Sequence, residues 1–263
     1  MRAAPLVKRP LESAAGPGQR QGVLTAWCRA GLDLFFPPRC LGCSSPRPHS
    51  LPPLFCPDCL DQIHPLLSPL CSCCGRPFPG AAEDNHYCGA CLQRPPRFRR
   101  ARAAVLYDPP IAHAIHACKY HGEFAGLATF AALAHHSPAI AELAESDYIL
   151  PVPLHPKRLR HRGFNQALLL ARALFPHRRR VIKADLLLRR RWTEPQTGMD
   201  GRKRRNNLRG AFALGQPELI KNRRILLVDD VFTTGSTANE CAKVLAAAGA
   251  ASIEVLTLAR VRE

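Results

Sequence analysis

Apolar and polar residues follow two different periods along the last two thirds of the chain. Short runs that are apolar or strictly alternating predict strands, and apolar residues at every third or fourth position predict helices. The most apolar run, residues 223–230 (RRILLVDD), predicts a parallel strand buried on both faces. The other predicted strands are 102–108 (an edge strand), 148–154, 181–190 and 252–260, and the predicted helices are 110–121, 123–145, 163–175 and 236–249.

This alternation predicts an α/β fold with an open, mainly parallel sheet and helices on both faces. In such sheets, ligands bind beyond the carboxyl ends of the strands. Asp229 and Asp230 stand at that end of the most apolar strand, and the chain continues as VFTTGST into a predicted helix. These residues therefore define the candidate ligand site.

The turn between this strand and helix has the composition of a phosphate cradle. The first N–H groups of a helix have no partner within it and point at whatever lies in front. Gly235 permits a close approach, and the hydroxyls of Thr233, Thr234, Ser236 and Thr237 add donors. Two adjacent carboxylates would repel a bare phosphate, so a sugar phosphate fits better, because it also offers hydroxyl donors.

Three other interpretations compete with this one. P-loop nucleotide hydrolases also end a strand in aspartates, but the chain has no Gly-Lys dipeptide for the required partner loop. Response-regulator-like pockets use paired aspartates without the threonine–glycine helix start. A purely structural strand, turn and helix with capping hydroxyl residues remains open.

Cysteines set the first third of the chain apart. Ten of the twelve lie before residue 92, and eight of these form four C-x-x-C pairs. Two such pairs complete a tetrahedral zinc site, so one or two structural zinc ions are predicted, which would supply folding energy that a small core lacks. Redox motifs and reduced structural cysteines are the alternatives. The predicted ligands are Cys40, Cys43, Cys56, Cys59, Cys71, Cys74, Cys88 and Cys91.

Other cysteines and histidines in this region are not assigned as ligands. Cys73 lies inside the third pair and could replace a neighbour, but the glycine after Cys74 favours Cys74. Four complete pairs leave no vacancy for His49, His64 or His86, which are expected to be exposed.

The charge adds a second kind of partner. The net charge of +17 predicts a polyanionic partner, and residues 151–210 contain 17 Lys and Arg against three acidic residues. One small ligand needs only a few of these, whereas a nucleic-acid backbone uses many, with Phe98 and Trp192 as candidate stacking platforms. No apolar run reaches the length of a membrane span, and the first residues lack the apolar core of a secretory signal. The cytoplasm is therefore the predicted compartment.

Composition predicts four segments. Residues 1–33 form a largely disordered extension, and residues 34–93 form the cysteine-rich module. Residues 94–101, rich in arginine and proline, form a basic hinge, and residues 102–263 form the α/β domain.

The run LLVDDVFTTGST resembles the signature of type I phosphoribosyltransferases, which bind 5-phosphoribosyl-1-pyrophosphate. Four more segments, YDPPIAHAIHACKYHGEF, PVPLHPKRLRHRGFNQALLLARAL, PQTGMDGRKRRNNLRGAF and LTLAR, resemble successive blocks of the ComF/GntX family. Members of that family join amino-terminal double zinc ribbons to a type I phosphoribosyltransferase fold. The resemblance covers residues 34–260.

The resemblance implies roles for individual residues. Asp229 and Asp230, the candidate catalytic residues, would bind the ribose hydroxyls, and residues 233–237 would bind the 5′-phosphate. The loop 151–166 would bind the pyrophosphate with Mg²⁺, and residues 195–207 would form a mobile flap. The basic residues implied to contact the ligand are Lys119, Arg158, Arg162, Arg204 and Arg205.

Two functions follow from the resemblance. The first is binding of phosphoribosyl pyrophosphate with transfer to an acceptor that the sequence does not identify. The second is a non-catalytic competence role, in which the chain handles single-stranded DNA during natural transformation together with other competence proteins.

Overall fold

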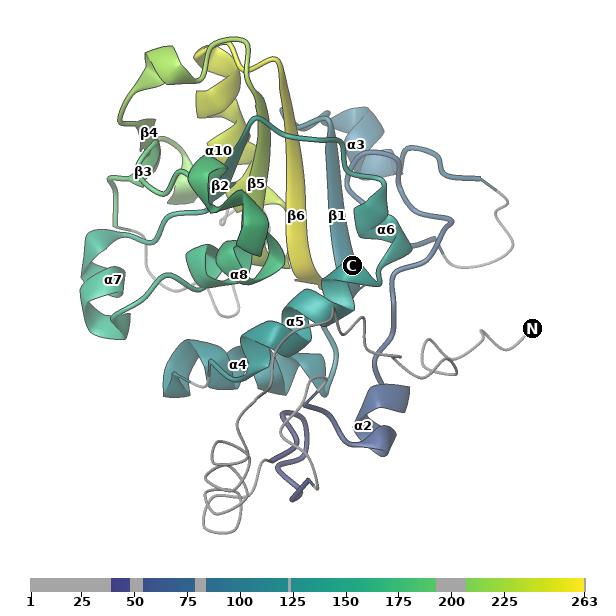
Figure 1. Cartoon of the computed structure of the whole chain (residues 1–263). Coiled ribbons are helices and arrows are strands. Elements are labelled where there is room, and N and C mark those ends of the chain that lie inside the picture. Colours follow the sequence, from purple (N-terminus) through teal and green to yellow (C-terminus); the bar gives the residue numbers. More distant parts are fainter. Residues whose placement is uncertain (1–38, 48–53, 79–83, 123, 193–206, 263) are drawn as a thin grey trace.

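The computed structural model describes residues 39–47, 54–78, 84–122, 124–192 and 207–262. At its centre is a four-stranded sheet in the order β2–β5–β6–β1, in which all neighbours are parallel (Figure 1). The predicted α/β fold with a parallel sheet is therefore confirmed. Its strands are β1 (Arg100–Leu106), β2 (Tyr148–Pro151), β5 (Arg224–Phe232) and β6 (Ser252–Arg260).

Helices cover both faces of this sheet because successive strand residues point to opposite sides. On β5, Leu226 and Val228 face the core formed with α4, α5 and α8, whereas Ile225 and Leu227 face α10. Both faces of β5 are thus apolar, as predicted for a doubly covered strand. The covering helices are α4 (Ile111–His121), α5 (Gly126–His135), α8 (Gln166–Leu174) and α10 (Ser236–Ala247).

The predicted long helix 123–145 is wrong in extent. It is divided into α5 and the short α6 (Pro138–Ala141). Proline lacks an N–H group and disfavours helical geometry in the residue before it, and Ser137 is accordingly extended.

A short helix, α7 (Pro156–Arg162), was not predicted within the loop 151–166. It begins after His155, whose side chain accepts a hydrogen bond from the backbone N–H of Lys157, and it ends at Gly163 in the left-handed conformation.

The predicted strand 181–190 is also wrong in extent. Ile182 makes only an isolated bridge to Ile149, and residues 187–189 form β3 (Leu187–Arg189) in a separate antiparallel pair with β4 (Phe212–Leu214). Leu187 and Phe212 are buried in the core beneath α10, which draws this pair away from the main sheet. The described residues also form two 3₁₀ turns, η1 (Pro176–Val181) and η2 (Pro217–Leu219).

β1 is the edge strand, as predicted, but it is buried from Ala101 to Leu106. Residues that follow the first cysteine group cover its outer edge. The N–H of Leu66 donates to the carbonyl of Ala104 at 3.0 Å, and the N–H of Leu106 donates to the carbonyl of His64 at 2.8 Å. The module thereby satisfies backbone groups that an open edge would expose.

The two cysteine-rich halves pack on opposite faces of the sheet. Cys40 and Cys59 belong to the core that includes α4 and α5, and Cys71 and Cys88 belong to the core that includes α10. The halves contain α2 (Pro57–Asp61) and α3 (Gly89–Gln93), which lie far apart in Figure 1.

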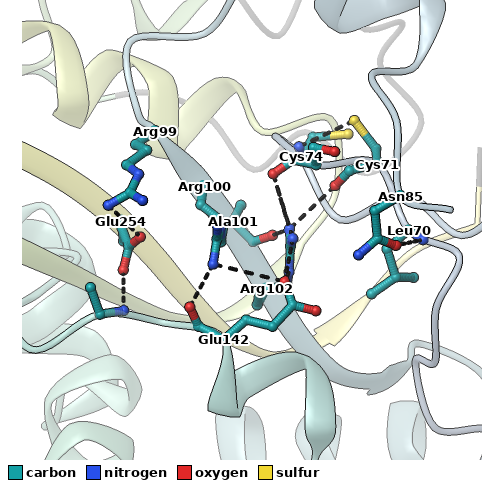
Figure 2. Close-up of polar contacts among 12 residues, drawn as sticks. Leu70, Cys71, Cys74, Asn85, Arg99, Arg100, Ala101, Arg102, Glu142 and Glu254 are labelled. Carbon is teal, nitrogen blue, oxygen red and sulfur yellow. Dashed lines mark hydrogen bonds and ion pairs between the residues drawn. The ribbon is translucent and has the colours of Figure 1, made fainter.

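An arginine of β1 anchors the second half. Arg102 is 2% exposed and donates to the carbonyl of Cys71 at 3.2 Å. It also forms an ion pair of 2.7 Å with Glu142, so the ribbon, β1 and the residue after α6 are joined at one point (Figure 2).

The segment predicted as a basic hinge, 94–101, is packed against the α/β domain. Phe98 is buried, and the N–H of Arg99 donates to the carbonyl of Ile253 at 2.7 Å. Phe98 therefore offers no face for stacking. In the part of the chain that the structure describes, no helix has both the length and the apolar character needed to cross a membrane.

Candidate functional site

Each cysteine-rich half gathers four thiols. Within each group, all the Sγ atoms lie within 4.8 Å of one another. The Sγ atoms of Cys43 and Cys56 are 3.7 Å apart and those of Cys74 and Cys88 are 3.8 Å apart. Zinc–sulfur bonds of about 2.3 Å place tetrahedral ligands about 3.8 Å apart, so this spacing suits zinc. The groups are Cys40, Cys43, Cys56 and Cys59, and Cys71, Cys74, Cys88 and Cys91, which are the predicted ligands in the predicted pairs.

The electrostatics of the second group call for a cation. Burial raises the pKa of Cys91, and the charge of Cys74 raises it further. Burial also opposes ionisation of Cys71, but N–H groups of Cys88 and Cys74 donate to its sulfur and lower its pKa to about 6. Four sulfurs this close can all ionise only when a bound cation neutralises them, and zinc supplies that charge together with folding energy.

The residues set aside as ligands lie outside these groups. Cys73 is buried, but its thiol donates to the carbonyl of Phe98 at 3.9 Å. His64 and His86 are exposed, as expected, and His86 stacks on Phe78 with ring centroids 3.8 Å apart. His49 lies outside the described residues, as does the predicted extension 1–33.

The second candidate site lies where β5 runs on past β2. Pro151 and Val228 are the last pair between these strands, so Asp229 and Asp230 follow just beyond the end of β2. Because strand side chains alternate, the carboxylate of Asp230 lies on the α4 face and that of Asp229 on the α10 face. The end of the sheet therefore presents one carboxylate on each face.

Lys119 of α4 contacts the first of these carboxylates. Its Nζ lies 2.6 Å from Oδ2 of Asp230, and the two side chains are only 21% and 13% exposed. Burial lowers the pKa of Lys119, but the charges of Asp230 and Asp229 outweigh burial, and the pKa is raised. A small cavity under this pair is lined by Cys118, Gln166 and apolar residues of α4, α5 and α8.

The second carboxylate, that of Asp229, has a strongly shifted pKa. Burial raises its pKa to about 7, and the charge of Asp230 contributes in the same direction. Arg189 of β3 lies on the same face: burial and then the charge of Arg158 lower its pKa, while the charge of Asp229 opposes that change. Arg189 was not among the predicted site residues. The feature of the sequence that could have identified it is the run of arginines at 189–191, which lies at the end of the predicted strand 181–190.

The turn after β5 has the geometry of a phosphate cradle. Gly235 precedes the first residue of α10 with φ of 70°, and a Cβ atom there would lie 2.6 Å from Cζ of Phe232. Glycine is therefore required on two grounds. It has no side chain to satisfy the first N–H groups of the helix. The hydroxyls of Thr234 and Ser236 lie 2.8 Å apart, and Thr233 and Thr237 are half-buried beside them.

Two predicted arginines lie one turn apart on α7, which has no buried residues. The guanidinium of Arg158 is 5.6 Å from the ring centroid of Trp192, and that of Arg162 is 5.3 Å from that of Tyr120. Arg162 also donates to Oε1 of Gln166 at 2.6 Å, and Gln166 is one of the residues that line the cavity beside Asp230. Arg204 and Arg205 lie outside the described residues, as does the predicted flap 195–207 except for Asn207.

Comparison with known proteins places both parts of the chain. Residues 31–92 match the double zinc ribbon domain, and residues 164–263 match the phosphoribosyl transferase domain. Competence protein F of Haemophilus influenzae is 34% identical over 239 residues, which cover 86% of this chain and 98% of the relative. The chain belongs to the ComF family. The resemblance predicted from the sequence is thus confirmed, with the two domains in the expected order.

Two further similar proteins show the range of the family. DNA utilization protein YhgH of Escherichia coli K12 is 36% identical over 195 residues, covering 73% of this chain and 84% of the relative. Competence protein ComFC of Streptococcus pneumoniae is 28% identical over 206 residues, covering 73% of this chain and 87% of the relative.

Proposed function

We propose that this ComF-family chain binds 5-phosphoribosyl-1-pyrophosphate with Mg²⁺ at the end of β5. One observation carries the proposal: Asp229 and Asp230 lie near the end of β5, and the turn that follows this strand passes through the left-handed Gly235 into α10. The carboxylates accept hydrogen bonds from the ribose hydroxyls. The N–H groups and hydroxyls of residues 233–237 donate to the 5′-phosphate.

The surrounding charge suits the pyrophosphate group. Guanidinium groups bind phosphate oxygens in a bidentate manner. Arg189 lies close enough to Asp229, and Lys119 to Asp230, for their charges to interact. Arg158 lies close enough to both Arg189 and Arg162 for the same kind of interaction. Aspartate and hydroxyl oxygens are the hard ligands that Mg²⁺ prefers. When bound, Mg²⁺ supplies charge neutralisation to the pyrophosphate.

A transfer reaction at this site follows from the same charges. The bond between the anomeric carbon and the pyrophosphate oxygen breaks, its electron pair leaves with pyrophosphate, and a lone pair of the acceptor forms the new bond. Arg158 and Arg162 stabilise the leaving group, while Asp229 and Asp230 hold the ring and offset its developing positive charge. The acceptor is unassigned.

Replacing both aspartates, Asp229→Asn with Asp230→Asn, is expected to weaken the affinity for phosphoribosyl pyrophosphate at least about 100-fold. Each lost hydrogen bond to a charged group contributes about 1.5–3 kcal/mol. The measurement is calorimetric titration with MgCl₂ present. Asp147→Asn is the control, because its carboxylate pairs with Arg224 at the opposite end of the sheet. Unchanged affinity in the double variant would remove the basis of the proposal.

The same titration has a pH signature. The pKa of Asp229 is raised to about 7 without ligand, and only the ionised form accepts hydrogen bonds from both hydroxyls. Deprotonation therefore accompanies binding, so the affinity of the wild-type chain rises from pH 6 to pH 8 and then levels off. In the double variant this rise is expected to be smaller, because the contribution of Asp229 is lost.

A second candidate function, handling of single-stranded DNA, is favoured by cations that flank exposed aromatic rings. Trp192 is 39% exposed, with Lys157 and Arg158 at 5.9 and 5.6 Å from its ring, and Tyr120 is 63% exposed under Arg162. Rings that stack on bases, next to cations that follow the backbone, suit single-stranded nucleic acid. The names of the relatives, which refer to competence and DNA utilization, agree with this candidate.

Trp192→Ala is expected to weaken binding of a single-stranded oligonucleotide about 5- to 150-fold, because one stacked base contributes about 1–3 kcal/mol. Fluorescence anisotropy at several salt concentrations measures the affinity, which should fall steeply as salt rises in both proteins. Tyr87→Ala, which removes an exposed ring from the second cysteine-rich half, should change nothing. Binding without salt dependence would contradict this role.

A further inference from the structure

Arg260, the last residue of β6, is a buried cation that contacts the second cysteine group. One terminal nitrogen donates to the carbonyl of Cys74 at 2.8 Å, and the other lies 3.9 Å from the sulfur of Cys74. Its guanidinium also lies 4.8 Å from the ring centroid of Phe232, the residue that pairs with it in the sheet. Arg260 therefore touches a predicted zinc ligand and the last residue of β5 together.

Phe232 in turn supports the phosphate cradle. It is buried, and its ring packs so closely under Gly235 that a Cβ atom there would lie 2.6 Å from Cζ. Phe98 meets it edge-on, with centroids 6.1 Å apart, and the carbonyl of Phe98 accepts from the thiol of Cys73. Close packing leaves this ring no alternative position, so a shift of the ring must move the turn.

The positive charge of Arg260 strengthens its interaction with the second cysteine group. Across the described ranges, no carboxylate lies within ion-pair distance of this guanidinium. A buried arginine needs a counter-charge, and a zinc ion bound by four thiolates carries a net negative charge beside it. With zinc bound, the negative charge of the second cysteine group would stabilise the position of Arg260, and the guanidinium of Arg260 packs against the ring of Phe232.

We propose that Arg260 is a positioning residue that ties the phosphate-binding turn to the second zinc group through Phe232. The effect of Arg260 on ligand affinity rests on the proposed function. The structural connection itself rests only on the contacts of Arg260 with Cys74 and Phe232. The second zinc group is then part of the support of the ligand site as well as part of the fold.

The chain contains a matched control for this tie. Arg102 is equally buried at 2% exposed and also donates to a carbonyl of the second group, that of Cys71 (Figure 2). Among the described residues, the side chain of Arg102 donates hydrogen bonds to the ribbon, to Ala101 and to Glu142, whereas it is the guanidinium of Arg260 that packs on Phe232. Both Arg260→Met and Arg102→Met should loosen the ribbon, but only Arg260→Met should also displace the ring of Phe232. Comparing the two variants therefore separates these effects.

The test compares both methionine variants and Arg260→Lys with the wild-type chain. Zinc content, the rate at which a chelating dye takes up each zinc ion, and hydrogen exchange at the start of α10 are measured. Arg260→Met is expected to keep two zinc ions, to release one of them faster, and to raise exchange of the Asn239 amide, which donates to the carbonyl of Gly235, about tenfold or more. Arg102→Met should speed release without changing that exchange. Arg260→Lys keeps the charge but not the planar fork and should fall between.

Two results would overturn the tie: wild-type exchange in Arg260→Met, or an equal rise of exchange in Arg102→Met. If Arg260→Met fails to fold, Arg260→Lys decides by the same criteria. A parallel titration with phosphoribosyl pyrophosphate and Mg²⁺ separates the two proposals. Absence of binding by the wild-type chain would refute the proposed function, while the exchange data still decide the tie. Wild-type binding with unchanged exchange in Arg260→Met would refute only the tie.

Discussion

Cys91→Ser is expected to remove one zinc ion per chain and to leave most molecules unfolded at 37 °C. Cys91, Cys71 and Cys88 are buried in the core that they share with α10, and the partly buried Cys74 packs against it. A structural zinc ion contributes about 10–16 kcal/mol, whereas a whole domain is stable by only about 5–15 kcal/mol. The measurements are zinc content by atomic emission and thermal unfolding by circular dichroism.

Cys73→Ser is the matched control for this loss. Cys73 is just as buried, at 4% against 6% for Cys91, but it belongs to neither thiol group. The substitution should keep two zinc ions and cost about 1–3 kcal/mol, the range for a buried polar change. Two zinc ions in folded Cys91→Ser, or one in Cys73→Ser, would show that the ligand assignment is wrong.

Gly235→Ala is expected to weaken phosphoribosyl pyrophosphate binding at least about 30-fold and to lower the free energy of unfolding by about 2–4 kcal/mol. The left-handed φ of 70° is strained for alanine, and the new Cβ atom would lie 2.6 Å from the ring of Phe232. Either the ring or the turn must move, and both lie at the proposed phosphate site. Calorimetric titration and chemical denaturation measure the two effects.

Gly249→Ala provides the comparison, because this glycine lies beyond the other end of α10 with φ of 81°. Its Cβ atom would meet only Lys221, at 3.6 Å, an ordinary contact. The expected cost is about 1–2 kcal/mol for the backbone conformation, with unchanged affinity. Equal losses of affinity in both variants would mean that the turn has no special role in binding.

Much of the candidate site was predictable because its parts are close together in the sequence. The apolar run of β5, the two aspartates, the glycine turn and α10 are consecutive, so period and motif determine them without reference to the rest of the chain. The C-x-x-C pairs were predictable for the same reason, since each pair lies within one turn. Lys119 was implied by family resemblance, and the structure places it on Asp230.

Other parts depended on contacts that no local pattern records. β3 pairs with β4 and does not join the main sheet, because Leu187 packs in the apolar core beneath α10. That displacement brings Arg189 to the α10 face of β5, near Asp229. The segment 94–101 has the composition of a linker, yet it packs against the sheet through Phe98.

The parallel α/β fold, the two cysteine groups and the strand–turn–helix that carries the aspartates could all be predicted from the sequence, because they follow from short-range periodicity and spacing. Two features form only when the chain folds: the placement of the two cysteine groups on opposite faces of the sheet, and the contact of the second group with Arg260, which packs on Phe232 beneath Gly235. Arg260 and Cys74 are 186 residues apart, and their contact forms only once the sheet has brought β6 beside the ribbon. A charged side chain such as Arg260 can be buried only where residues from distant segments supply its polar partners, so a local sequence pattern does not predict this contact.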